Sequence, residues 1–192
     1  NLARVKAMGG AIAVQDRMAF AGEIFANRYG KEAAAHAPPL RAMVRAGIPV
    51  GAGTDATRVS SHNPWLSLYW MVTGKTVGGT QLASAEYRLS RDEAPRLHTG
   101  GRAWFSGDED VRGPIAPSRY GGSAILSADY LSVTDEQIRT IESVLTVTGG
   151  DVVYVAEPFA KVAPEPLPAV SPEWSPVAAF GGYQQSPRNR GR

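Results

Sequence analysis

The residues best placed to do chemistry form a short segment, Gly53-Thr54-Asp55, at the end of an apolar run. Val50 and Ala52 are apolar, and polar residues gather only after Gly53. This pattern predicts a buried strand that ends in a glycine-containing turn, with a carboxylate at the C-terminal end of the strand. A carboxylate can act as a general acid or base, but Asp after Gly-Thr also commonly caps a turn or helix. The residues alone leave both roles open.

The other polar candidates follow the two predicted strand ends. Gln15 follows a short apolar run, and Arg58 and His62 fall in the segment after Asp55. Each has an ordinary alternative, because loops are polar and an Arg close to a carboxylate can serve only as its ion partner. Two further histidines are expected to be structural: His98 as a packing residue on a helix, and His36 at the surface or a helix end.

The elements that must position these residues alternate between strand and helix. Residues 11–15 follow Gly9-Gly10 and predict a strand buried on both faces. Residues 20–29 suit a short helix or a long loop, and Pro38-Pro39 opens a helix that stops at Gly47. After the strand at 50–54, Asn63-Pro64 starts another helix, which ends near Gly74. This order predicts the βα repeat of a barrel or an open parallel sheet.

The second half of the chain has a different pattern. Ser90 and Glu93 fit a capping box, which predicts one helix running toward Trp104. Beyond Gly107 the β-branched runs predict strands at 123–127, 141–148 and 152–155, the last two joined in a hairpin. Prolines crowd the chain from Pro158 onward, which predicts an extended tail.

Composition excludes several classes of protein. The 192 residues are 43% hydrophobic and carry a formal net charge of +2, which suits one globular domain. The charges are spread along the chain, with a basic cluster only at Arg188, Arg190 and Arg192, so nucleic-acid binding is not expected. No run of residues suits a membrane span, and the absence of cysteine removes disulfides and thiolate chemistry.

Several blocks in a fixed order resemble the amidohydrolase superfamily, in the amidohydrolase 3 branch of N-substituted formamide deformylase-like enzymes. The first block is Gly53-Thr54-Asp55-Ala56-Thr57-Arg58, followed by Asn63-Pro64-Trp65 and Gly74-Lys75-Thr76. Ala103-Trp104-Phe105-Ser106-Gly107, Gly113-Pro114-Ile115-Ala116-Pro117 and the segment from Val144 to Tyr154 agree with it. The resemblance spans roughly residues 1 to 159.

This resemblance implies a fold and a chemistry. The fold would be α/β, the C-terminal part of a (β/α)₈ barrel with residues 11–15 as strand seven and 50–54 as strand eight, plus part of an accessory β-sandwich. Active sites of such barrels lie at the C-terminal ends of the strands. Asp55 would then be the catalytic carboxylate and a ligand of a divalent metal, zinc by expectation. His62, Arg58 and Gln15 would contact the substrate. The remaining ligands of the family lie on strands that this chain lacks, and its start reads as the middle of a helix, so we expect a fragment that is inactive by itself.

The expected organisation is a barrel segment at 1–106, an accessory β segment at 107–159 and a Pro-rich tail at 160–192. The expected function is metal-dependent hydrolysis of an amide or formamide-type carbon–nitrogen bond in a small molecule. The alternative is a catalytically incomplete remnant that acts, if at all, through association with a partner. We expect a cytoplasmic location, and the sequence leaves a homo-oligomer open.

Overall fold

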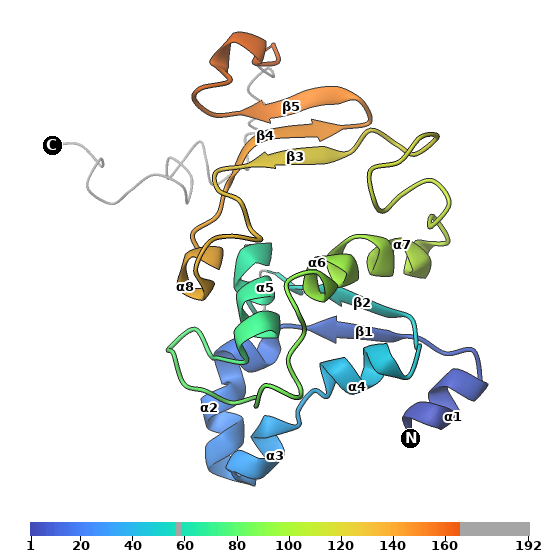
Figure 1. Cartoon of the computed structure of the whole chain (residues 1–192), viewed down its shortest axis with the longest axis vertical. Coiled ribbons are helices and arrows are strands. Elements are labelled where there is room, and N and C mark those ends of the chain that lie inside the picture. The colour runs from blue at the N-terminus through green and yellow to red at the C-terminus, as the bar shows by residue number, and fades with distance from the viewer. Residues whose placement is uncertain (57–58, 166–192) are drawn as a thin grey trace, which may run out of the picture.

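The computed structural model describes residues 1–56 and 59–165. Its described part is a mixed α/β structure with two separate sheets (Figure 1). The three-stranded antiparallel sheet lies at one end of the molecule, and helices α5 (Pro64–Thr73), α6 (Glu93–His98) and α8 (Asp135–Ile138) lie between it and the pair of parallel strands. No helix among the described residues is both long enough and apolar enough to cross a membrane.

The predicted parallel strand pair is confirmed. Strands β1 (Ile12–Gln15) and β2 (Val50–Gly53) pair in parallel, with Ile12 opposite Val50 and Gln15 opposite Gly53. Each strand is one residue shorter than the sequence predicted. The N-terminal helix α1 (Leu2–Ala7) precedes β1.

The connection between β1 and β2 is helical throughout most of its length. It contains α2 (Arg17–Tyr29), α3 (Lys31–Ala35) and α4 (Leu40–Arg45). The sequence left helix and loop open for residues 20–29, and the structure shows a helix there. Helix α2 begins two residues after the last residue of β1. The predicted helix after Pro38-Pro39 is confirmed as α4, which buries Leu40 and Met43.

Helix α5 (Pro64–Thr73) is the most deeply buried helix of the described chain, and its ends follow its sequence signals. The Asn63 side chain accepts a hydrogen bond of 2.9 Å from the Trp65 amide, and Gly74 ends the helix with φ of 67°. Such caps satisfy backbone groups that a helix end leaves without partners. Tyr69 and Met71 are each 1% exposed.

The single helix predicted from Ser90 toward Trp104 is wrong in one respect, because the structure divides it in two. Helices α6 (Glu93–His98) and α7 (Gly100–Ser106) are separated at Thr99. The predicted capping box does form, with reciprocal hydrogen bonds between Ser90 and Glu93 of 2.7 and 3.1 Å. The break lets α7 lie directly against β2, where a Cβ atom on Gly101 would collide with the Val50 carbonyl oxygen.

The second sheet contains β3 (Ser123–Leu126), β4 (Ser143–Thr148) and β5 (Asp151–Val155), in that order. Both pairings are antiparallel, so the predicted hairpin across Gly149-Gly150 is confirmed. Both glycines have positive φ, as tight hairpin turns favour. The predicted strand from 141 begins two residues late, because Ile141 is 2% exposed and belongs to the core instead.

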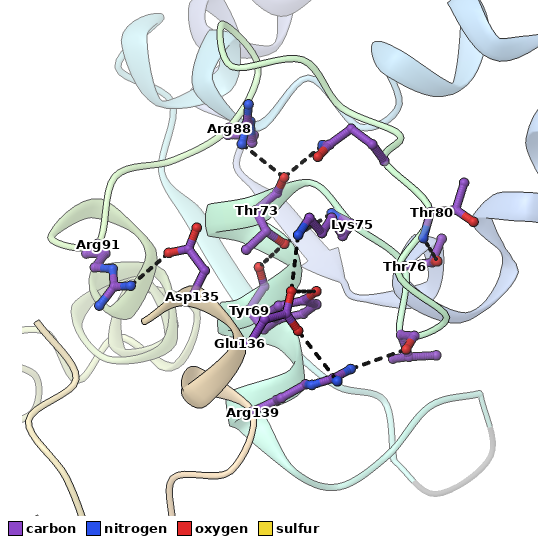
Figure 2. A network of polar contacts seen from close by, with 12 residues as sticks. Tyr69, Thr73, Lys75, Thr76, Thr80, Arg88, Arg91, Asp135, Glu136 and Arg139 are labelled. Carbon is purple, nitrogen blue, oxygen red and sulfur yellow. Dashed lines mark hydrogen bonds and ion pairs between the residues drawn. The ribbon is translucent and has the colours of Figure 1, made fainter. Parts of the chain in front are cut away.

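Helix α8 (Asp135–Ile138) connects this sheet to α5 through a polar network (Figure 2). Glu136 Oε1 accepts hydrogen bonds from the Tyr69 hydroxyl at 3.0 Å and from Lys75 Nζ at 3.1 Å. Its other carboxylate oxygen lies 3.5 Å from an Arg139 nitrogen. The Lys75 and Tyr69 hydrogen bonds hold the pKa of Glu136 below its usual range, so the carboxylate stays charged and keeps both contacts.

A second contact of α8 runs through Arg91. One guanidinium nitrogen of Arg91 lies 2.7 Å from Asp135 Oδ1, and the other donates to the Tyr130 carbonyl at 2.8 Å. The network of Figure 2 thus ties α8 to two segments of the first half of the chain.

The predicted Pro-rich tail is described only as far as residue 165. The described part of it contains a short 3₁₀ helix, η1 (Ala160–Val162). Its remainder, 166–192, lies outside the described residues.

Burial of α8 leads to a stability prediction. Ile138 is 0% exposed, so Ile138→Ala leaves a cavity and should lower the free energy of unfolding by about 2–5 kcal/mol. Leu131→Ala is the matched control, since Leu131 is 59% exposed and its truncation should change the free energy by less than about 0.5 kcal/mol. Urea unfolding of both variants measures the difference. Equal small losses would show that α8 does not pack against α5.

Candidate functional site

A cavity of about 730 Å³ lies between the paired strands and helices α6 and α7. Its walls are formed by both strands, by Asp55 shortly after β2, and by residues of α6 and α7. Arg112, further along the chain, also lines it. The lining residues are Ala13, Val14, Gln15, Gly51, Ala52, Gly53, Asp55, His98, Thr99, Arg102, Ala103, Phe105, Ser106 and Arg112. The cavity therefore includes the C-terminal ends of both parallel strands.

Side chains along β1 alternate between exposed and buried. Ala13 and Gln15 are exposed, whereas Val14 between them is buried at 6% exposure. Opposite them, β2 presents glycine, and a Cβ on Gly51 would lie 2.7 Å from the Phe105 ring. Glycine at this position is what allows α7 to close the cavity on that side.

Asp55 stands at the mouth of the cavity, two residues after the last residue of β2. It is exposed and has φ of 52°, the left-handed region that non-glycine residues seldom adopt. Within the described residues its carboxylate has no hydrogen-bond partner, so the capping role left open by the sequence is not seen there. The Ser60 hydroxyl, which donates to the Thr54 carbonyl, holds the turn instead.

The structure brings together two of the four candidate residues named from the sequence. Gln15 and Asp55 both line the cavity, from neighbouring strand ends. His62 is exposed and is not among the lining residues. Arg58 lies outside the described residues. His36 ends helix α3, as expected, with its ring 4.5 Å from the Tyr87 ring.

His98 is a cavity residue that the sequence suggested only as a packing residue. Its Nε2 atom lies 3.0 Å from the hydroxyl oxygen of Ser67, which is fully buried. Burial, together with the charge of Arg102, lowers the pKa of His98 to about 4. The imidazole is therefore neutral near pH 7 and can share one proton with Ser67. The helix break at Thr99, directly after His98, has no sequence signal beyond Gly100-Gly101.

Asp16 is a second residue that sequence reasoning missed. It directly follows β1 and is 0% exposed, and neither carboxylate oxygen has a hydrogen-bond partner among the described residues. Burial raises the pKa of Asp16, while the nearby Ser60 hydroxyl and the backbone oppose the rise. A polar residue immediately after Gln15 gave no indication that it would be buried.

The described residues do not by themselves make a catalytic metal site. No group of three or more His, Asp or Glu side chains in 1–56 and 59–165 is arranged to hold a metal ion. A catalytic zinc site takes three protein ligands. Asp55 offers one carboxylate at the cavity mouth, which is compatible with a metal whose other ligands come from elsewhere.

Comparison with known proteins supplies the family. The sequence model of the amidohydrolase family matches residues 1–154, which include both parallel strands, the cavity and nearly all of the three-stranded sheet. The chain belongs to the amidohydrolase family. A search of curated proteins gave no significant match. The family assignment supports a hydrolase, and it covers the block around Asp55 that carried the resemblance in the sequence.

The environment of His98 leads to a titration prediction. Because burial and then the Arg102 charge disfavour the imidazolium, an NMR titration of the His98 ring should give a midpoint of about 4. Arg102→Gln removes the repulsive charge and should raise this midpoint, though not to the usual value of 6.5, since burial remains. Arg96→Gln, which changes an exposed charge on α6, serves as the control. A wild-type midpoint near 6.5 would contradict the buried position of the ring.

Proposed function

We propose that this chain is the C-terminal segment of a metal-dependent amidohydrolase that hydrolyses an amide or formamide-type carbon–nitrogen bond in a small molecule. Asp55 is the catalytic carboxylate and a metal ligand of the complete site. One observation carries the proposal. In a chain of the amidohydrolase family, the Asp55 carboxylate is exposed to a cavity at the C-terminal end of a parallel strand. This is the end of the strands at which barrel enzymes place their catalytic groups.

The role of Asp55 follows from its chemistry. Amide hydrolysis at neutral pH needs an activated water, and a bound divalent metal supplies this by lowering the pKa of the water. A carboxylate at the cavity mouth can hold the proton that the water gives up. Asp55 is suited to this task because its oxygens are not engaged by other described residues. The other ligands of the zinc or related metal come, in this proposal, from parts of the polypeptide outside this chain.

The neighbouring residues are proposed to bind the substrate. Gln15 lines the same cavity, and its amide can both donate and accept hydrogen bonds, which suits an amide substrate. His62 and Arg58 belong to the segment after Asp55, and we assign them contacts with the outer part of the substrate. The cavity lining does not include His62, so its proposed contact is with a part of the substrate that extends beyond the cavity.

The alternative function is that of an incomplete remnant. The absence of a metal-binding group among the described residues is compatible with this alternative as well as with the first proposal. Such a remnant would act only by associating with a partner. The two proposals differ in what Asp55 does once the remaining ligands are supplied.

The first test concerns turnover. In the complete polypeptide that carries this segment, Asp55→Asn should reduce kcat for amide or formamide hydrolysis by orders of magnitude. Asn is nearly isosteric, but it cannot accept the proton from the activated water, so kcat should fall far more than KM changes. Asp110→Asn is the control, because Asp110 is exposed and does not line the cavity.

Metal content and thermal midpoint are matched to wild type before the rates are compared. Wild-type turnover in the Asp55→Asn variant would remove Asp55 from catalysis and leave the remnant as the better proposal.

The second test concerns metal. One carboxylate cannot replace the three or more ligands of a catalytic site, so the isolated chain should bind zinc weakly or not at all in equilibrium dialysis. Asp55→Ala should change this binding little. Tight, stoichiometric zinc binding that is lost in Asp55→Ala would show that this chain carries a full ligand set.

A further inference from the structure

The cavity at the strand ends contains charged side chains of both signs that do not pair with one another. Asp55 lines it from the turn after β2, and Arg102 of α7 and Arg112 beyond α7 also line it. The ion pairs formed within residues 1–56 and 59–165 include none between Asp55 and either arginine. A carboxylate and a guanidinium that share a cavity without pairing can each act on a different part of one bound molecule.

The two arginines differ in the contacts that they already make. Arg112 lies 3.4 Å from the Asp108 carboxylate, and its guanidinium lies 5.7 Å from the centre of the Tyr120 ring. Arg102 is exposed, and it takes part in none of the ion pairs or cation–π contacts found in the described part of the chain. Arg102 is therefore the cation of the cavity that is available to a ligand.

The charge of Arg102 influences the wall of the cavity as well as the surface. His98 lines the same cavity, and its pKa is lowered first by burial and then by the Arg102 charge. His98 is neutral near pH 7, so it adds no second positive charge at this wall. Among the described carboxylates only Asp55 lines the cavity. An anionic group that enters beside Arg102 thus meets a positive charge that no neighbouring carboxylate cancels.

The chemistry of a guanidinium selects a carboxylate as the matching group. Guanidinium groups are permanently charged, and their planar fork donates two parallel hydrogen bonds to the oxygens of a carboxylate. Gln15, which also lines the cavity, offers a donor and an acceptor to an amide. Ala103 and Phe105 supply apolar surface on the α7 side of the cavity. The lining therefore suits a small molecule that has an amide, an apolar part and a carboxylate.

We propose that the substrate is a small amide that also carries a carboxylate, and that Arg102 is the specificity-determining residue that binds this carboxylate. The inference deepens the proposed function and rests on it, because the amide is the group hydrolysed at Asp55. Recognition of the carboxylate itself requires only the cavity of this chain. Arg102 binds a part of the substrate that does not react, so its loss weakens binding and leaves the chemical step largely unchanged.

The first test measures binding by NMR on the isotope-labelled chain, without metal and at neutral pH. N-formylleucine supplies both the amide and the carboxylate, and N-formylleucinamide is its uncharged match. The signals followed are those of the His98 ring and the Arg102 Nε–Hε group. N-formylleucine should shift both signals in a saturable way. N-formylleucinamide should bind about tenfold more weakly, as the loss of one hydrogen-bonded charge predicts.

Variants at position 102 identify the group responsible. Arg102→Gln should weaken the binding of N-formylleucine about tenfold and leave that of N-formylleucinamide unchanged, with the His98 ring as the readout. Arg102→Lys should recover part of the loss, because lysine keeps the charge but lacks the planar fork. Arg96→Gln is the matched control and should bind like wild type, since it removes one exposed positive charge at a position that does not line the cavity.

The second test uses the complete polypeptide that carries this segment. Its kcat/KM should be higher for N-formylleucine than for N-formylleucinamide, and Arg102→Gln should remove this preference mainly through KM. Arg96→Gln should keep the preference.

Four results would overturn the proposal: equal binding of the acid and the amide, no binding of either up to the solubility limit, a preference that survives Arg102→Gln, or an equal loss in Arg96→Gln. Loss of the preference in Arg112→Gln but not in Arg102→Gln would overturn the assignment to Arg102. A failure of Asp55 as the catalytic group would appear instead as wild-type turnover in Asp55→Asn, and it would leave the binding results on this chain unchanged.

Discussion

The parallel pairing of β1 with β2 is the constraint on which the candidate site depends. Its register sets Gln15 opposite Gly53 and therefore places the residues that follow both strands at one edge. Asp55 and Gln15 reach the same cavity for this reason, although 39 other residues separate them in the chain. A slip of one residue would move the exposed Gln15 side chain to the buried face of the strand, where Val14 now lies, since neighbouring side chains of a strand point to opposite faces.

Close approach of backbones completes the site. Helix α7 can lie on β2 only because Gly51 and Gly101 have no side chains, and the cavity wall that carries His98 and Arg102 follows from that contact. The two short helices α6 and α7, separated at Thr99, both contact β2.

Helix α5 connects this region to the rest of the molecule. Its buried face contributes Tyr69 and Met71 to a core shared with α8, and the Tyr69 hydroxyl reaches Glu136 at 3.0 Å. Apolar burial supplies the larger share of this contact, because the ion pairs of Lys75 and Arg139 with Glu136 are solvent-accessible and such pairs contribute little. The polar network of Figure 2 sets the orientation of α8.

The sequence by itself determined the features that depend on local chemistry. Asn63-Pro64 and Gly74 bounded α5, the Ser90–Glu93 box formed, and Gly149-Gly150 made the hairpin, because caps and turns are satisfied within a few residues. The apolar runs also predicted the parallel strands and placed Asp55 at a strand end. Tertiary structure alone decided the rest. Four features depend on which segments distant in sequence come into contact, and residue type does not encode those contacts locally. They are the burial of Asp16, the cavity position of His98, the division of α6 from α7 and the position of His62 outside the cavity.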